Sequence, residues 1–331
     1  MTVQIVPMSL GEIFEQTFKV IGRTFARTLP LIALFMIPAG ILISLASDNL
    51  FSTVADLAHD QAARDVASIS LPSDLMFFGI AVVLFAVSGI IADMGVTLLS
   101  CGEVASEPLA WGDALQRSFS IRFARQLGQL ALEMVSLAGI LVAPIILAVI
   151  LAGDHKGLAL LLGVLLLPVG VGLVIYLKVC WSFTTASIMW EDAGTLQSFQ
   201  RSGSLVQGSW WRVFGILLLL TILVEIVVGV VQASLNLVTM GTYSAEYFKS
   251  LHPFSRELVN PDAAFQMLRP LGLGLAISVS VGTMLTLFLQ PVYRSVLYFD
   301  LRARKDEFMP PGKEQDPDGG SWEIPPPPPM G

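Results

Sequence analysis

Six long apolar segments dominate the pattern of hydrophobic and polar positions along this chain. A helix that crosses a membrane needs about 20 mostly apolar residues, and each segment reaches that length. The third and fourth segments are separated only by Asp154, His155 and Lys156, which predicts an antiparallel helical hairpin. The pattern therefore predicts an all-α membrane protein with six transmembrane helices. The expected spans are residues 28–47, 75–100, 127–153, 157–182, 211–238 and 270–298.

A shorter amphipathic segment precedes the first, third and fifth spans. In the first copy, Phe14, Phe18 and Phe25 recur at helical spacing and so share one face. Helices of this kind lie in the membrane interface. We therefore expect three repeats, each an interfacial helix followed by a helix pair, with packing on the bundle without a lipid role as the alternative. The copies contain "IFEQTF", "ALQRSF" and "SFQRSG", and the helices are expected near residues 10–27, 111–126 and 194–210.

The distribution of Lys and Arg predicts the orientation in the membrane. Cytoplasmic loops carry an excess of both residues. Most Lys and Arg lie in cytoplasmic segments when both chain ends are placed in the cytoplasm. The first 27 residues lack the pattern of a cleavable signal peptide, so the first span is expected to be retained. We therefore expect a multi-pass protein of the cytoplasmic membrane. In that orientation only five of the 19 Lys and Arg lie outside: Arg64, Lys156, Lys249, Arg256 and Arg269.

Composition agrees with a membrane protein and narrows the partners. Hydrophobic residues make up 54% of the chain and charged residues 14%, well below the roughly 25% of soluble domains. A net charge of −7 provides no basic field for nucleic acid. The membrane domain is expected to cover residues 1–308, followed by a disordered cytoplasmic tail at 309–331. Five consecutive prolines in that tail favour a polyproline helix that could bind a protein partner, the alternative being a plain solvated tail.

Residues for catalysis are scarce. The chain has three histidines, His59, His155 and His252, which lie far apart in the sequence, and two cysteines, Cys101 and Cys180, expected to be free thiols. No HExxH motif, clustered metal-ligand set, Walker A motif, dinucleotide fingerprint or GxSxG elbow is present. We therefore expect no enzyme activity, no catalytic residue, no metal and no cofactor.

Charged residues inside the spans are the first candidates for function, since charge at mid-bilayer costs several kcal/mol. All but Glu225 lie within about 10 Å of the cytoplasmic ends of their spans. Pairing and snorkelling would make them structural, whereas a polar vestibule for a headgroup or solute would make them functional, and both interpretations remain open. Glu225 stands alone between "LLLLTILV" and "IVVGVV" and is expected to be neutral or paired with another helix. The candidates are Asp93, Glu133, Lys178, Glu225 and Arg294.

Basic residues at the cytoplasmic surface form the second candidate group. Anionic headgroups attract a nearby Lys or Arg by about 1 kcal/mol. Asp300 is expected to pair with one of the three basic residues that follow it. The headgroup candidates are Arg117, Arg122, Arg201, Arg212, Arg302, Arg304 and Lys305.

Three stretches resemble one known family: "MSLGEIFEQTFKVIGRTFARTLPLIAL", "SFQRSGSLVQGSWWRVFGILLLL" and "PVYRSVLYFDLRARKDE". Over residues 8–307 the chain is similar to the glycerophosphoryl diester phosphodiesterase membrane domain, a bacterial six-span family. The third stretch resembles its closing Tyr-x-Asp-Leu-Arg-x-Arg-Lys motif, here Tyr298 to Lys305. Some members are fused to a soluble phosphodiesterase domain that this chain lacks. The resemblance therefore implies a six-span integral membrane protein without the enzymatic activity.

Two functional hypotheses follow. The first is a non-enzymatic membrane protein that organises lipids or partner proteins at the inner membrane surface. The alternative is a transporter or channel for a small or amphiphilic solute, using Glu225 and a polar layer of Asp93, Glu133 and Lys178. The sequence names neither a substrate nor an oligomeric state.

Overall fold

The computed structural model describes residues 7–56, 61–152, 155–250 and 268–305, and within these ranges it is all-α. Six helical stretches are long and apolar enough to cross a membrane, which confirms the predicted fold class and number of spans. In hydrocarbon a helix satisfies its own backbone hydrogen bonds, which explains why these apolar segments are helical. The helices are α1 (Leu10–Asp56), α2 (Gln61–Val104), α3 (Trp111–Ser118), α4 (Ile121–Ala152), α5 (Lys156–Cys180), α6 (Thr184–Glu191), α7 (Thr195–Val206), α8 (Trp210–Ser250) and α10 (Leu268–Arg304).

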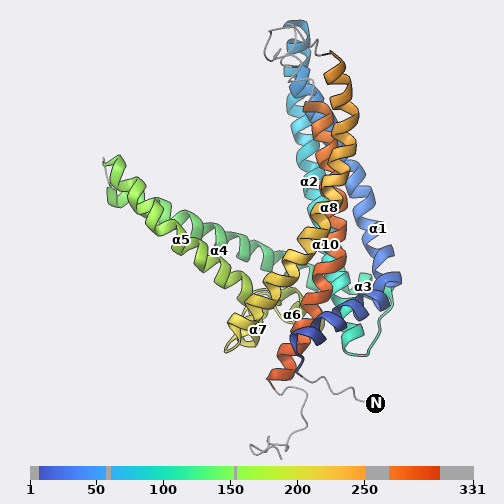
Figure 1. The fold of residues 1–331 in the computed structure, drawn as a ribbon, viewed down its shortest axis with the longest axis vertical. Helices are drawn as coiled ribbons and strands as arrows, with labels where there is room; N and C mark the ends of the chain where they lie inside the picture. The colour runs from blue at the N-terminus through green and yellow to red at the C-terminus, as the bar shows by residue number, and fades with distance from the viewer. Residues whose placement is uncertain (1–6, 57–60, 153–154, 251–267, 306–331) are drawn as a thin grey trace, which may run out of the picture.

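The long helices divide into two groups (Figure 1). Helices α1, α2, α8 and α10 run side by side and form what we call the bundle. Helices α4 and α5 pack against each other and leave the bundle at an angle as a separate arm. The two groups meet at one end, called the base, where α3, α6 and α7 also lie together with both ends of the described chain. The molecule is therefore V-shaped.

The first interfacial helix and the first span, expected as separate elements at 10–27 and 28–47, form one helix. Helix α1 has 47 residues, which at 1.5 Å each is about 70 Å, more than twice the thickness of the hydrocarbon core. Its first part changes direction relative to the rest (Figure 1). Pro30 lies inside the helix, and a proline there removes one backbone hydrogen bond and favours a kink. The chain therefore changes direction by a bend within α1, whereas two separate helices were expected.

The other two expected interfacial helices differ from the first and from each other. The segment at 111–126 is interrupted after α3, so that Ile121 already begins the span helix α4. The segment at 194–210 forms α7, which ends at Val206. Helix α6, between the fourth span and α7, was not predicted. The structure thus does not confirm three equivalent units, and the repeat stays a prediction.

One local feature is nevertheless common to the three copies of the repeated motif. The fifth position is buried in each: Thr17, Ser118 and Ser202. The first two hydroxyls donate to the carbonyl four residues earlier, at 2.7 and 2.8 Å. Ser202 instead donates to the Cys180 carbonyl at 2.6 Å and accepts from the Phe183 backbone N–H at 3.1 Å. Ser202 therefore satisfies backbone groups that are freed where α5 ends, which allows α6 to turn away.

The expected outer loops are shorter than the sequence indicated. Most of 48–74 is helical, because α1 continues to Asp56 and α2 begins at Gln61. Helix α8 continues to Ser250, well past the expected end of the fifth span at 238. The tail at 309–331 lies outside the described residues.

A buried carboxylate ties the two ends of the described chain together at the base. Asp300, with no exposed surface, accepts hydrogen bonds from the Met8 backbone N–H at 2.7 Å and from Arg212 at 2.7 Å. It also accepts from Arg304 at 3.0 Å, which confirms the expected local pair. Both arginines donate in turn to the Met8 carbonyl, at 2.8 and 2.7 Å. The start of the chain, α8 and α10 therefore share one charged cluster.

Replacing Asp300 with alanine should lower the apparent melting temperature of the detergent-solubilised protein. The change leaves two arginines and a backbone N–H without their shared acceptor. Because the arginine side chains are about one third exposed and keep access to water, we expect a moderate loss of about 1–3 kcal/mol. Asp113→Ala, at an exposed position of α3, is the matched control and should leave melting unchanged. Equal melting of both variants would contradict this role for Asp300.

Candidate functional site

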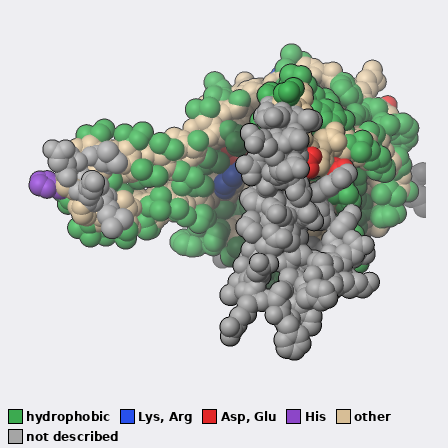
Figure 2. All heavy atoms as spheres, turned by 90° about the horizontal axis from the view of Figure 1, so that it is seen from above, with side chains coloured by type: hydrophobic (Ala, Val, Ile, Leu, Met, Phe, Trp, Pro, Cys, Tyr) green, Lys and Arg blue, Asp and Glu red, His purple; other side chains and the backbone are tan. Residues whose placement is uncertain are grey.

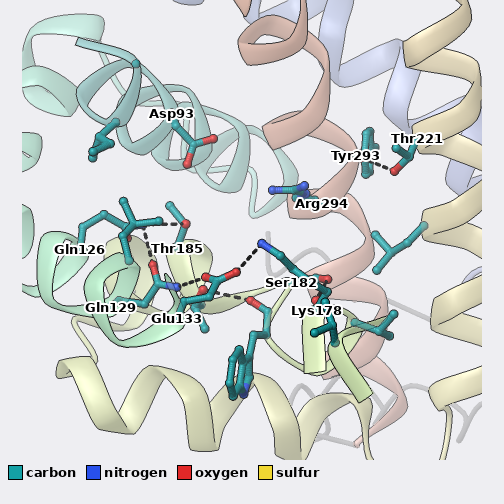
Figure 3. A pocket seen from close by; sticks show the side chains of 18 of the residues that line it. Asp93, Gln126, Gln129, Glu133, Lys178, Ser182, Thr185, Thr221, Tyr293 and Arg294 are labelled. Atoms are coloured by element: carbon teal, nitrogen blue, oxygen red, sulfur yellow. Dashed lines mark hydrogen bonds and ion pairs between the residues drawn. The ribbon is translucent and has the colours of Figure 1, made fainter. Parts of the chain in front are cut away.

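A pocket of about 630 Å³ lies where the arm meets the bundle (Figure 3). Its walls come from α2, α8 and α10 on the bundle side and from α4, α5 and the start of α6 on the other side. Helix α4 packs against α5 and the short base helices, but has no substantial contact with the four bundle helices. The space between arm and bundle therefore remains open above the pocket.

The arm side of the pocket carries a connected row of polar side chains on α4 and α5. Lys178 forms an ion pair with Glu133 at 2.6 Å, and Gln129 donates to the other carboxylate oxygen at 2.6 Å. Gln126 donates to Gln129 at 2.9 Å and to Thr185 of α6 at 3.2 Å. Both glutamines are almost fully buried. The chain of bonds fixes the Glu133 carboxylate, so this ion pair is neutralised within the arm.

The bundle side carries two opposite charges that do not pair with each other. Asp93 of α2 and Arg294 of α10 point into the same space from facing helices (Figure 3). Within the described residues, Asp93 makes no hydrogen bond or ion pair. Arg294 donates only to Gln290, at 3.1 Å, and its buried Nε has no hydrogen-bond partner. An ion in an apolar setting is unfavourable unless it is paired and hydrogen-bonded, so two incompletely satisfied ions here are costly.

Aromatic and apolar side chains complete the wall. Tyr293 of α10 and Thr221 of α8 share a hydrogen bond of 3.0 Å, which joins the two bundle helices beside the pocket. Phe85, Trp181 and Phe214 also line it. The pocket thus combines a charged floor with walls that suit hydrocarbon.

Glu225 does not line this pocket. It is exposed on α8 and has no hydrogen bond or ion pair in the part of the chain that the structure describes. At about 100° per residue, it lies on the same helical face as the pocket residues Phe214, Leu218 and Thr221, one turn farther from the base. Of the five candidates inside the spans, the structure therefore brings four together and leaves Glu225 one turn above them.

Two consecutive carboxylates at the end of α6 hold the arm in place. Glu191 receives two hydrogen bonds of 2.7 Å from Arg201 of α7 and further contacts from Tyr298 and Arg302 of α10. Asp192 has a left-handed backbone conformation, with φ of 58°, and turns its side chain the other way. Glu191 therefore connects α6 to the bundle.

Asp192 connects the same turn to the arm. Its carboxylate accepts hydrogen bonds from Arg122 at 2.9 Å and Arg125 at 2.8 Å, both in the first turns of α4. The hydrogen bond from Arg122 holds the pKa of Asp192 below its usual value, so the pair stays ionised at neutral pH. This short acidic turn thus joins the arm to the bundle, in addition to the direct contact of α5 with α8.

The surface cations expected among lipid headgroups have other partners in most cases. Arg122 and Arg201 pair with Asp192 and Glu191, and Arg302 lies 3.5 Å from Glu191. Arg212 and Arg304 bind Asp300, as described above, and Lys305 donates to the Gln207 carbonyl at 3.0 Å. Arg117 is exposed and has no partner within the described residues. Most of these charges thus join the base helices to one another.

Several residues of the site were missed in the sequence. Gln126 and Gln129 precede the candidate Glu133 at steps of three and four, which makes a polar stripe on an otherwise apolar span that could have been recognised. For Glu191 and Asp192, the one signal in the sequence was that two acidic residues are adjacent in a chain with few charges. Tyr293 gave no signal. Within the described ranges, no three His, Cys, Asp or Glu side chains gather closely enough to hold a metal ion.

Comparison of the chain with protein-family models, curated proteins and solved structures gives no match. The resemblance to the phosphodiesterase membrane domain family therefore stays an expectation. What the protein does has to be inferred from the pocket itself.

Removing the acidic turn should loosen the arm. Spin labels at Leu165 of α5 and Val230 of α8, both exposed, would report the separation of arm and bundle after replacement of the two native cysteines. In Glu191→Gln/Asp192→Asn, we expect a broader distance distribution in pulsed electron spin resonance, because losing charged hydrogen bonds costs about 1–3 kcal/mol.

The control for this experiment is Glu15→Gln, which removes an exposed pair with Lys19. Exposed ion pairs of this kind contribute little to stability. The distance distribution of Glu15→Gln should therefore match that of the spin-labelled protein with Glu191 and Asp192 unchanged. A double variant with the same narrow distribution as the control would contradict the anchoring role.

Proposed function

We propose that this is a non-enzymatic membrane protein that binds an amphiphile in the pocket between arm and bundle, with the base on the cytoplasmic side. The observation that carries the proposal is the convergence of Asp93, Glu133, Lys178 and Arg294 from four helices on one cavity beneath apolar walls. A polar headgroup would bind to these residues. Its hydrocarbon chains would extend along the gap between α4–α5 and α8.

The surroundings of the pocket suit an occupant from the bilayer. Hydrophobic side chains cover the arm (Figure 2). Residues such as Ile146 on α4 and Leu165 on α5 are more than half exposed, as expected for side chains in contact with lipid. Because α4 has no substantial contact with the bundle, an amphiphile can reach the charged floor sideways from the membrane.

The pocket supports the proposed lipid role better than the base surface does. At the base, six of the seven candidate cations already have protein partners, which leaves little charge for headgroups. In the pocket, Asp93 has no ion-pair partner among the described residues and Arg294 has none for its buried Nε, whereas at the base an unpartnered atom, Arg122 Nη1, belongs to an arginine that already pairs with Asp192. Of the two carboxylates in the described lining, Glu133 is held by Lys178 and Asp93 has no nucleophile or histidine beside it, so we infer binding in place of catalysis.

Neutralising the pocket cations should reduce the amount of lipid that co-purifies with the protein. We expect Lys178→Gln/Arg294→Gln to retain about tenfold less lipid in native mass spectrometry, because Arg294 loses a charge-assisted hydrogen bond of about 1.5 kcal/mol or more to the headgroup and Glu133 is left without its cation. Arg117→Gln and Lys19→Gln, both on the exposed surface, serve as controls.

The controls also separate the pocket from the surface. Unchanged retention in the pocket variant, together with loss in Arg117→Gln, would overturn the proposal and return the lipid site to the base surface. Size-exclusion profiles of all variants would establish that they are equally folded.

Movement of the amphiphile across the membrane is a second candidate function. Two observations favour it: the arm is fastened mainly at the base, and Glu225 lies one turn above the pocket on the same face of α8. A headgroup that leaves the charged floor would meet this carboxylate on the way to the opposite side of the bilayer.

Glu225→Gln tests this second function without disturbing the pocket. If the protein moves lipid, proteoliposomes with the variant should exchange fluorescent lipid between leaflets several-fold more slowly than those with the unchanged protein. The reason is that the headgroup loses a charged group to interact with in the apolar part of the membrane. The control is Ser234→Ala, on the opposite face of α8, where the exposed hydroxyl donates to the Val230 carbonyl of its own helix. Exchange no faster than in protein-free liposomes would exclude transport of the tested lipid and leave binding untouched.

A further inference from the structure

The charges of the pocket constrain the headgroup that it can hold. Two of the four charges, Glu133 and Lys178, already neutralise each other at 2.6 Å. The other two, Asp93 and Arg294, have opposite signs but form no ion pair across the cavity. The pocket is therefore neutral overall, with one acidic and one basic group left to be satisfied.

Each of these two groups has a preferred ligand. The planar guanidinium of Arg294 matches the oxygens of a phosphate, and its buried Nε lacks an acceptor. The Asp93 carboxylate only accepts hydrogen bonds when ionised, and an ammonium group is its natural partner. The buried Oε1 of Gln126, also in the lining, is a second acceptor without a donor.

A headgroup with only one sign of charge would leave a conflict. An anionic headgroup would satisfy Arg294, but would bring a second negative charge towards Asp93 and leave that carboxylate unpaired. A purely cationic headgroup would meet the same problem at Arg294. A headgroup that carries both signs pairs each of the two groups with an opposite charge.

We infer that the ligand carries a zwitterionic headgroup, with a phosphate bound by Arg294 and an ammonium bound by Asp93 and Gln126. This inference rests on the proposed function and specifies the chemical class of the amphiphile. The same chemistry occurs in a phospholipid headgroup and in a free phosphate ester of an amino alcohol. The experiment below distinguishes between these two sources.

The test measures headgroup selection by the full-length protein. The purified protein is incubated in mixed micelles with equal amounts of phosphatidylethanolamine and phosphatidylglycerol of identical acyl chains, and the bound lipids are quantified by mass spectrometry. We expect the zwitterionic lipid to exceed the anionic one by about tenfold, because like charges brought together are strongly unfavourable. Since the measurement is a ratio within the bound pool, partial loss of folded protein does not alter it.

Single substitutions separate the two halves of the site. Asp93→Asn gives the pocket a net positive charge, so the bound ratio should fall to one or reverse in favour of phosphatidylglycerol. Arg294→Gln should reduce the binding of both lipids, and Arg294→Lys should restore part of it. Asp113→Asn, the same substitution at an exposed position, should keep the ratio of the unchanged protein.

Soluble glycerophosphoethanolamine, added in excess, identifies the source of the headgroup. Displacement of bound lipid would support recognition of the free phosphate ester, and persistence of the lipid would support recognition of the phospholipid. Equal binding of both lipids, or a ratio that Asp93→Asn does not change, would overturn the zwitterion inference while leaving amphiphile binding intact. Absence of any bound lipid, or retention unaffected by every pocket variant, would overturn both.

Discussion

The acidic turn at the end of α6 determines the shape on which everything else depends. Glu191 faces the bundle and is held by Arg201, while Asp192 faces the arm and is held by Arg122. The left-handed backbone at Asp192 ends α6 there, and the two neighbouring carboxylates bind arginines of different helices. These ion pairs act together with the contact of α5 with α8, where Trp210 donates to the Tyr176 carbonyl, because α4 itself has little contact with the bundle. The gap above the pocket exists because the two groups of helices are joined at one end.

The two groups of charges in this molecule do different work. Those at the base are mostly paired within the protein, since Asp300 and Glu191 each accept several hydrogen bonds from arginine side chains and other donors. Those in the pocket are only half closed, since Glu133 and Lys178 form a pair whereas Asp93 and Arg294 do not. A charge without a partner is unfavourable in an apolar setting. A ligand that pairs with Asp93 and Arg294 would remove this cost, which favours its binding in the pocket.

The spans were predictable because hydropathy is a local property of each segment. The expected hairpin at 127–182 is likewise the arm of the structure, since only three polar residues separate its helices. The angle of that arm could not be predicted, because it depends on contacts such as Arg122 with Asp192 between residues far apart in sequence. The bend of α1 was misjudged for a related reason: Pro30 marks a kink equally well as a break, and only packing decides between them. Four of the five charges expected inside the spans line one pocket, but which of them remain unpaired is a property of the assembled helices.

The cluster around Asp300 also sets an order of events during biosynthesis. The Met8 backbone emerges from the ribosome first, yet its partner carboxylate lies 292 residues later in the chain. Arg212, at the start of α8, likewise waits for that residue. Membrane insertion of the first five spans therefore yields a chain whose base is unfinished, and the sixth span completes it as the final step. The cluster therefore forms only after α10 has joined the other helices, although two of its members, Met8 and Arg212, are present much earlier.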